Sequence, residues 1–160
     1  MTPSTLPELP ILDLVDGFDR EWWFLSNFAF SPLLWEGVWY ATAEAAFAAG
    51  KTVDPALRLW ISQVVPPREA KRRGRQLALR PQWDTSHRYA VMRQVLRAKF
   101  TDPGLRTRLI NTGAALLVES NTWCDTQWGS CVCQRHRATP GHNHLGRMLM
   151  ALRDALTAVP

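Results

Sequence analysis

The strongest constraint on the fold is a run of small apolar residues, ATAEAAFAAG, which covers positions 41–50 and holds one charged side chain, Glu44. Thr42 is a favourable N-cap and Gly50 a favourable helix end, so we predict a helix between them. A glutamate in the first turn interacts well with the positive end of the helix dipole, which is one interpretation of Glu44. The other is that this carboxylate belongs to a functional site, and only the rest of the chain can separate the two.

The composition is that of a globular protein with a single domain. Of 160 residues, 46% are hydrophobic and 21% are charged, and no apolar run approaches the ~20 residues of a membrane span. The N-terminus, MTPSTLPELP, lacks both the basic start and the apolar core of a signal peptide. Three cysteines, an odd number, argue against a disulfide framework. We therefore expect a cytoplasmic protein with reduced thiols and no membrane partner, whose oligomeric state the sequence leaves open.

The charge balance predicts an anionic partner. There are 19 Lys and Arg against 14 Asp and Glu, so the formal net charge is +5 and the isoelectric point is about 9.6. Part of this charge lies in REAKRRGRQLALR, residues 68–80, which could contact the phosphates of a nucleotide or a nucleic acid. The alternative is that this segment is an ordinary solvated helix face.

The remaining local signals predict an α+β fold: one compact, mostly helical domain with one small β-sheet. FAFSPLLWEGVWY indicates two short strands joined by a tight turn at Glu36 and Gly37. ALLVE, residues 115–119, indicates a short buried strand. Further helices are expected after Asp54-Pro55, after Pro66-Pro67, from Asp84 as a cap through Phe100, after Asp102-Pro103, and from about His144.

Polar and aromatic residues alternate without helical or strand periodicity in ESNTWCDTQWGSC, residues 119–131. Loops of this kind often carry function. Asp125 lies between Trp123 and Trp128, and a carboxyl group among indole rings sits in a low-dielectric environment that can raise its pKa. The alternative is that Asp125 only forms an Asx-turn or a helix cap.

Six fragments of the chain together resemble the NADAR family, also called YbiA-like. They are FLSNFAFSP, WYATAEAAFAAGKT, GRQLALRPQWD, AKF, LLVESNTWCDTQWG and GHNHLGRMLMALRDAL, which occur in the order and spacing of that family over residues 18–156. The resemblance implies the YbiA-like fold, with an N-terminal extension at 1–17 and the domain at 18–158. It also implies an N-glycosidase that hydrolyses the bond between a ribose C1 and an exocyclic nitrogen.

The resemblance assigns roles to named residues. The functional carboxylates of the family fall on Glu44 and Asp125, which we expect to be catalytic, and its functional tryptophans fall on Trp83 and Trp128, which we expect to bind substrate. The chemistry is consistent with two carboxyl groups and a planar aromatic wall. Cleavage of a C–N glycosidic bond develops positive charge on the sugar, and it needs an acid for the departing nitrogen. The resemblance therefore favours a site role for Glu44 over capping alone, and we expect both carboxylates to face one pocket floored by the two tryptophans.

Three further polar residues are candidate substrate ligands. Lys51 follows Glu44 by seven residues, hence on nearly the same helix face, and could hold a phosphate. Asn27 and Asn143 could donate hydrogen bonds to ribose hydroxyls, although turn formation explains each of them equally well.

Cysteine and histidine are concentrated near the C-terminal end. The sequence CVCQRH has the compact look of a metal knuckle, but its C-x-C-x-x-H spacing is weaker than a paired C-x-x-C. A structural zinc and an ordinary surface loop both remain open for this segment, and we assign no metal and no other cofactor to catalysis. The six residues concerned are Cys124, Cys131, Cys133, His136, His142 and His144.

The family resemblance implies two substrate classes. One is ADP-ribose attached to guanine, on a nucleotide or a nucleic acid, and the other is a phosphoribosylamino-pyrimidine of riboflavin synthesis. Net positive charge, the basic segment 68–80 and the arginines Arg135 and Arg137 favour the first, because phosphate contacts dominate the binding of a nucleic-acid strand. A module that binds ADP-ribose or nucleic acid without cleaving it is the alternative from a different class.

Overall fold

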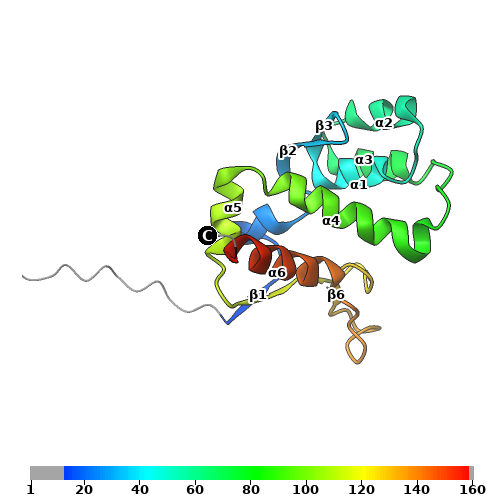
Figure 1. The fold of residues 1–160 in the computed structure, drawn as a ribbon. Helices are drawn as coiled ribbons and strands as arrows, with labels where there is room; N and C mark the ends of the chain where they lie inside the picture. Colours follow the sequence, from blue (N-terminus) through cyan, green and yellow to red (C-terminus); the bar gives the residue numbers. More distant parts are fainter. Residues whose placement is uncertain (1–12, 159–160) are drawn as a thin grey trace, which may run out of the picture.

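The alanine-rich segment forms helix α1 (Ala43–Ala49), which several other elements contact (Figure 1). They are the hairpin strands β2 (Phe30–Trp35) and β3 (Val38–Thr42) and the helices α2 (Pro55–Ser62), α3 (Pro67–Gly74) and α4 (Arg88–Lys99). All seven residues of α1 except Glu44 are buried. Small side chains let the neighbouring helices approach closely: a Cβ atom on Gly74 of α3 would lie 2.9 Å from the Cβ atom of Ala48. The run is therefore poor in polar groups because nearly every face of the helix meets another element.

The computed structural model describes residues 13–158, so residues 1–12 and 159–160 lie outside the described part of the chain. The mostly helical α+β fold is as predicted. The elements in chain order are β1 (Leu14–Asp16), η1 (Arg20–Leu25), β2 (Phe30–Trp35), β3 (Val38–Thr42), α1, α2 (Pro55–Ser62), α3 (Pro67–Gly74), η2 (Trp83–His87), α4 (Arg88–Lys99), α5 (Pro103–Ile110), β4 (Leu116–Val118), β5 (Ser120–Asn121), β6 (Ser130–Cys131) and α6 (His144–Thr157).

Within residues 13–158 the strands form three separate two-stranded pairs, where one small sheet was expected. β2 and β3 make the predicted antiparallel hairpin, whose turn residues Glu36 and Gly37 both have positive φ angles. β1 pairs in parallel with β4, and β5 pairs in parallel with β6. Residues 14–16 of the expected N-terminal extension thus form β1, and residues 1–12 of that extension are not described.

The buried side chains of helix α4 pack against β2 of the hairpin and against α1. Its start differs from the prediction: Asp84 does not cap it, because a π-helical turn over Trp83–His87 precedes it and Gln82 before that turn has a φ of 59°. The buried Lys99 donates a hydrogen bond from Nζ to the carbonyl oxygen of Ser26 at 2.8 Å, and burial lowers the pKa of this amine to about 7. One buried ammonium group thus ties α4 to the end of η1.

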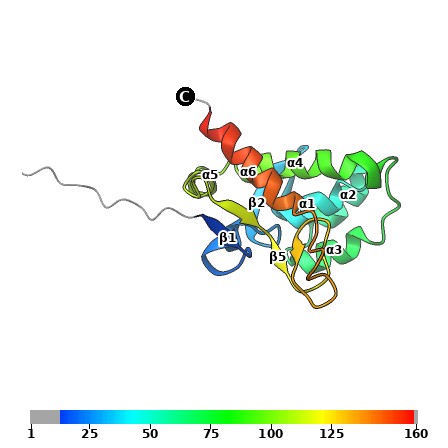
Figure 2. The ribbon, with the colours of Figure 1, turned by 90° about the horizontal axis from the view of Figure 1, so that it is seen from below.

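The C-terminal half of the fold places the 119–131 segment near α1. α6 packs on β4, α5 and α4, and Figure 1 and Figure 2 both show the segment that contains β5 and β6 beside the start of α6. The Trp128 ring of this segment packs against Phe47 of α1, with ring centroids 5.3 Å apart. The parallel pair β1–β4 lies directly before this segment, and the parallel pair β5–β6 joins its two ends. Within residues 13–158, the helices are all too short or too polar to span a bilayer.

Candidate active site

Glu44 lies in the first turn of α1, but Thr42 caps the helix. The Thr42 Oγ1 accepts the backbone N–H of Ala45 at 3.2 Å, and the N–H of Glu44 itself donates to the Asn27 carbonyl oxygen at 3.0 Å. Burial raises the pKa of Glu44 to about 7, against the opposing effect of nearby cations. A carboxyl group that exchanges its proton near neutral pH suits acid and base chemistry better than helix capping.

Asp125 lies in the loop between β5 and β6, and its backbone is held by Asn121. The Asn121 side chain accepts from the N–H of Asp125 at 3.1 Å and donates to its carbonyl oxygen at 2.8 Å. The Asp125 Oδ1 accepts the N–H groups of Gln127 at 3.0 Å and Trp128 at 2.9 Å. The predicted Asx-turn therefore exists, and it orients the carboxyl group because both bonds use the same oxygen.

Glu119, at the end of β4, is a third carboxyl group in the same neighbourhood. Burial raises its pKa to about 8, and the charges of Asp125 and Glu44 act in the same direction. Its Oε2 is buried and has no hydrogen-bond partner among the described residues. A Cβ atom on Gly129 would come within 3.3 Å of that oxygen, so the backbone of the loop covers it. An unpaired buried oxygen of this kind suits a carboxyl group that is neutral at pH 7.

Three cations act electrostatically on Glu44: Lys71 of α3, Arg75 at the C-terminal end of α3, and Lys51, two residues after α1. The charges of Lys71, Lys51 and Arg75 lower the pKa of Glu44, in that order of size. Lys51 is half-buried, and burial lowers its own pKa. Its Nζ lies 3.6 Å from the position that a Cβ atom on Gly74 would take, so the missing side chain at Gly74 leaves room for the lysine. The site thus combines three acidic and three basic side chains.

The two predicted tryptophans are linked through Phe47 of α1. The ring centroids of Phe47 and Trp83 are 5.2 Å apart, and those of Phe47 and Trp128 are 5.3 Å apart. Trp83 is only 5% exposed, so its ring mainly packs against the core. Trp128 is half-buried and also packs against Tyr89 and His144, with centroid distances of 5.6 and 6.3 Å. Of the two indoles, Trp128 has the larger surface free for a ligand.

The two predicted asparagines are both engaged with protein groups. Asn143 accepts from the N–H of Glu119 at 3.0 Å and donates to the Leu117 carbonyl oxygen at 2.9 Å, so it joins the start of α6 to β4. Asn27 is buried, and its Nδ2 contacts the sulfur of Met92 at 3.5 Å while its Oδ1 has no partner in the described chain. Their ribose contacts stay predictions, and the contact to Glu119 gives Asn143 a positioning role.

Two cavities of about 390 Å³ each lie away from Glu44. One is lined by Thr126, directly after Asp125, and by His136 and residues 139–142. The other lies between α4 and α6. The shared pocket for Glu44 and Asp125 therefore stays a prediction, supported by the charge of Asp125, which raises the pKa of Glu44.

Glu119, Lys71 and Arg75 are the site residues that sequence reasoning did not single out. A signal for Glu119 existed: it is the first polar residue after the buried strand and it opens the polar aromatic segment 119–131. Lys71 was hidden in a run of basic residues, where spacing alone does not show which side chain turns towards the carboxyl groups.

Replacing Glu119 with Gln is expected to stabilise the protein progressively as the pH rises from 5 to 8. A raised pKa means that the folded state holds a proton that the unfolded state has lost, so the wild type loses stability between the unfolded value near 4.5 and the folded value of about 8. The difference in the free energy of unfolding should grow by up to about 1.4 kcal/mol per pH unit. Urea denaturation at several pH values measures it, with the exposed Glu21→Gln as the control; a pH-independent difference would contradict the assignment.

Comparison with known proteins identifies relatives of this chain. A sequence profile of the NADAR domain matches residues 17–157. The N-glycosidase YbiA of Escherichia coli (strain K12) is 40% identical over 134 residues, which is 82% of this chain and 79% of that protein. The N-glycosidase Npun_R5314 of Nostoc punctiforme is 34% identical over 136 residues, covering 82% of this chain and 83% of its own.

A solved structure supports the same relationship. The NMR structure of E. coli YbiA superposes with a TM-score of 0.78 at 34% sequence identity, over 93% of this chain and 88% of that one. The family profile covers nearly all of the described residues, and the two relatives match at 40% and 34% identity. The chain therefore belongs to the NADAR domain family.

Proposed function

We propose that this protein is an N-glycosidase that hydrolyses a ribosyl C1–N bond, with Glu44 and Asp125 as the catalytic carboxyl groups. Curated relatives at 40% and 34% identity carry the name N-glycosidase, which makes the chain a hydrolase of N-glycosyl bonds. The observation that carries the proposal is the packing of Phe47, three residues after Glu44 on α1, against Trp128, three residues after Asp125, with ring centroids 5.3 Å apart. In agreement with this packing, the charge of Asp125 raises the pKa of Glu44 and of Glu119.

The two catalytic residues have different surroundings, which suits them to different roles. Asp125 is oriented by two backbone N–H groups and is suited to stabilise positive charge on the sugar at C1. Glu44, with a pKa of about 7, can give its proton to the departing nitrogen. The oxygen of a water molecule bonds to C1, one of its protons returns to a carboxyl group, and the C1–N bond electrons leave with the nitrogen.

For the substrate, ADP-ribose attached to guanine is our first choice. Lys51, Lys71 and Arg75 all act on the pKa of Glu44, and three separate cations can contact both phosphate groups of a diphosphate at the same time. The Lys71 Nζ also lies over the ring of Phe28, 5.5 Å from its centroid, so an aromatic side chain lies next to this cation. These contacts support a ligand that has two phosphates and planar bases.

The basic segment 68–80 contributes less free charge than its sequence suggests. Arg72 and Arg73 both donate hydrogen bonds to Glu69, and Arg73 also stacks on the ring of Trp60 at 4.6 Å. Arg68 and Arg75 remain exposed on α3 and at its end, as do Arg135 and Arg137 in the loop after β6. This smaller set favours a nucleotide or a short single strand over a long nucleic-acid interface.

The substrate is tested by comparing turnover of three compounds at two salt concentrations: ADP-ribosylated guanosine nucleotide, an oligonucleotide that carries ADP-ribosylated guanine, and a phosphoribosylamino-pyrimidine. We expect release of free ADP-ribose from the first two, with a steeper loss of rate on added salt for the oligonucleotide. Faster turnover of the pyrimidine with little salt effect would reassign the substrate and leave the catalytic residues unchanged. Tight binding of all three without cleavage would show a binding module instead.

A further inference from the structure

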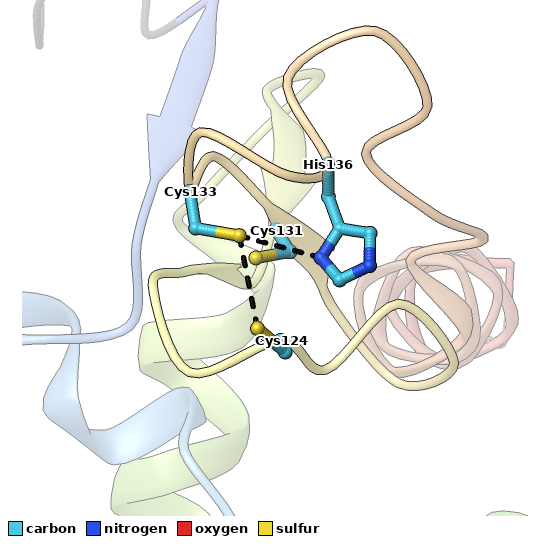
Figure 3. Close-up of side chains that lie close together, drawn as sticks. All are labelled: Cys124, Cys131, Cys133 and His136. Atoms are coloured by element: carbon cyan, nitrogen blue, oxygen red, sulfur yellow. Dashed lines mark hydrogen bonds between the residues drawn. The ribbon is translucent and has the colours of Figure 1, made fainter.

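Four of the six clustered cysteine and histidine residues come together at one point beside β6 (Figure 3). Cys124 comes from the loop after β5, Cys131 ends β6, and Cys133 and His136 belong to the turn that follows. Their three sulfur atoms and a ring nitrogen all lie within 4.8 Å of one another. His142 and His144 lie outside the group and stack on each other instead, with ring centroids 5.2 Å apart.

We propose that Cys124, Cys131, Cys133 and His136 bind one zinc ion in a closed structural site. A tetrahedral zinc with three thiolates and one imidazole holds its ligand atoms about 3.5–3.8 Å apart. The Sγ atoms of Cys124 and Cys133 are 3.7 Å apart, and the Cys133 Sγ is 3.3 Å from the His136 Nδ1. Thiolate and imidazole ligands in this number select zinc over hard cations such as Mg²⁺ and Ca²⁺.

The backbone around the four residues is arranged to keep them together. Cys133 and His136 are joined in one turn by a hydrogen bond from the His136 N–H to the Cys133 carbonyl oxygen at 3.0 Å. The N–H of the buried Cys131 donates to the Pro140 carbonyl oxygen at 2.6 Å, which closes the base of the loop. Cys124 has a φ of 66°, a left-handed conformation that residues with a side chain adopt only when their surroundings require it.

The loop that carries the cluster lacks the apolar contacts that would order it otherwise. Trp123 is 66% exposed and Val132 is 54% exposed, so the neighbours of the cluster contribute little to the core. A four-coordinate metal supplies folding free energy where a hydrophobic core is missing. Because all four positions are filled by protein, no position is left for a substrate or water, and the role is structural.

The position of the cluster also gives it a connection to the candidate active site. Cys124 immediately precedes Asp125, and His136 lines the same cavity as Thr126, which immediately follows Asp125. A zinc ion would therefore fasten the Asp125 turn to the segment after β6. The zinc site stands on its own geometry and does not depend on which bond the enzyme cleaves.

The test uses the full chain, purified without a polyhistidine tag, treated with excess zinc and then desalted. Elemental mass spectrometry should find about one zinc ion per molecule. Cobalt in place of zinc should give the intense visible bands of a tetrahedral site together with a thiolate-to-cobalt charge-transfer band. A stoichiometry below about one in ten, or octahedral cobalt without the charge-transfer band, would overturn the proposal.

Variants separate the four ligands from their neighbours. Cys133→Ser and His136→Ala should each weaken zinc binding at least about tenfold in a competition titration with a chelator. His142→Ala, in the same segment but outside the cluster, and Glu44→Gln should both bind zinc as the wild type does. Equal zinc affinity in Cys133→Ser and the wild type would contradict the site. It would also be contradicted if the metal-free protein contained a Cys124–Cys133 disulfide and still failed to bind zinc after treatment with excess reductant.

Discussion

Glu44→Gln is expected to lower kcat/KM for the ribosyl substrate by at least about 100-fold while the protein remains folded. Gln has nearly the shape of Glu but cannot give a proton to the departing nitrogen. Burial holds the pKa of Glu44 at about 7, so removal of the ionisable group relieves a desolvation cost in the folded state. The thermal midpoint at pH 8 should therefore stay unchanged or rise.

Steady-state kinetics from pH 5 to 9 measure this effect. The wild-type kcat/KM should depend on an ionisation near neutral pH, and the residual activity of Glu44→Gln should lack that dependence. Glu21→Gln, which changes an exposed glutamate of η1, is the matched control and should keep full activity. If Glu44→Gln retains more than about one tenth of the wild-type rate, Glu44 only positions other groups.

Asp125→Asn is expected to cause a loss of activity of similar size and little loss of stability. The Asn side chain keeps an oxygen that can accept the N–H groups of Gln127 and Trp128, so the turn should survive. The Asp125→Asn substitution removes the negative charge that stabilises the sugar cation in the transition state. Catalysis should fall about 100-fold or more, mainly in kcat.

Asp125→Ala distinguishes charge from turn formation. This variant loses both the charge and the two hydrogen bonds, and it should be less stable than Asp125→Asn by about 1–2 kcal/mol. Urea denaturation of the two variants in parallel, combined with kinetics, gives the comparison. Full activity in Asp125→Asn with reduced activity in Asp125→Ala would mean that Asp125 serves only the turn.

Local signals in the sequence were sufficient for the fold class and the family. Thr42 and Gly50 bound α1 because capping is a contact between neighbours in the chain, and the turn at Glu36 and Gly37 follows from a glycine, which tolerates positive φ. The family resemblance was readable because six fragments keep their order and spacing, and the profile match and the relatives confirm it.

The tertiary structure decided which side chains meet. Glu119 lies beside the loop of Asp125 because the Ser130 N–H, at the end of that loop, donates to the Glu119 carbonyl oxygen at 2.9 Å. The charge of Lys71 lowers the pKa of Glu44 and of Glu119, whereas Arg72 and Arg73 bind Glu69. The sequence held six cysteines and histidines within a short segment, and only folding selected four of them. Such groupings depend on contacts between residues far apart in the chain or on side-chain directions in a loop, and neither periodicity nor spacing carries that information.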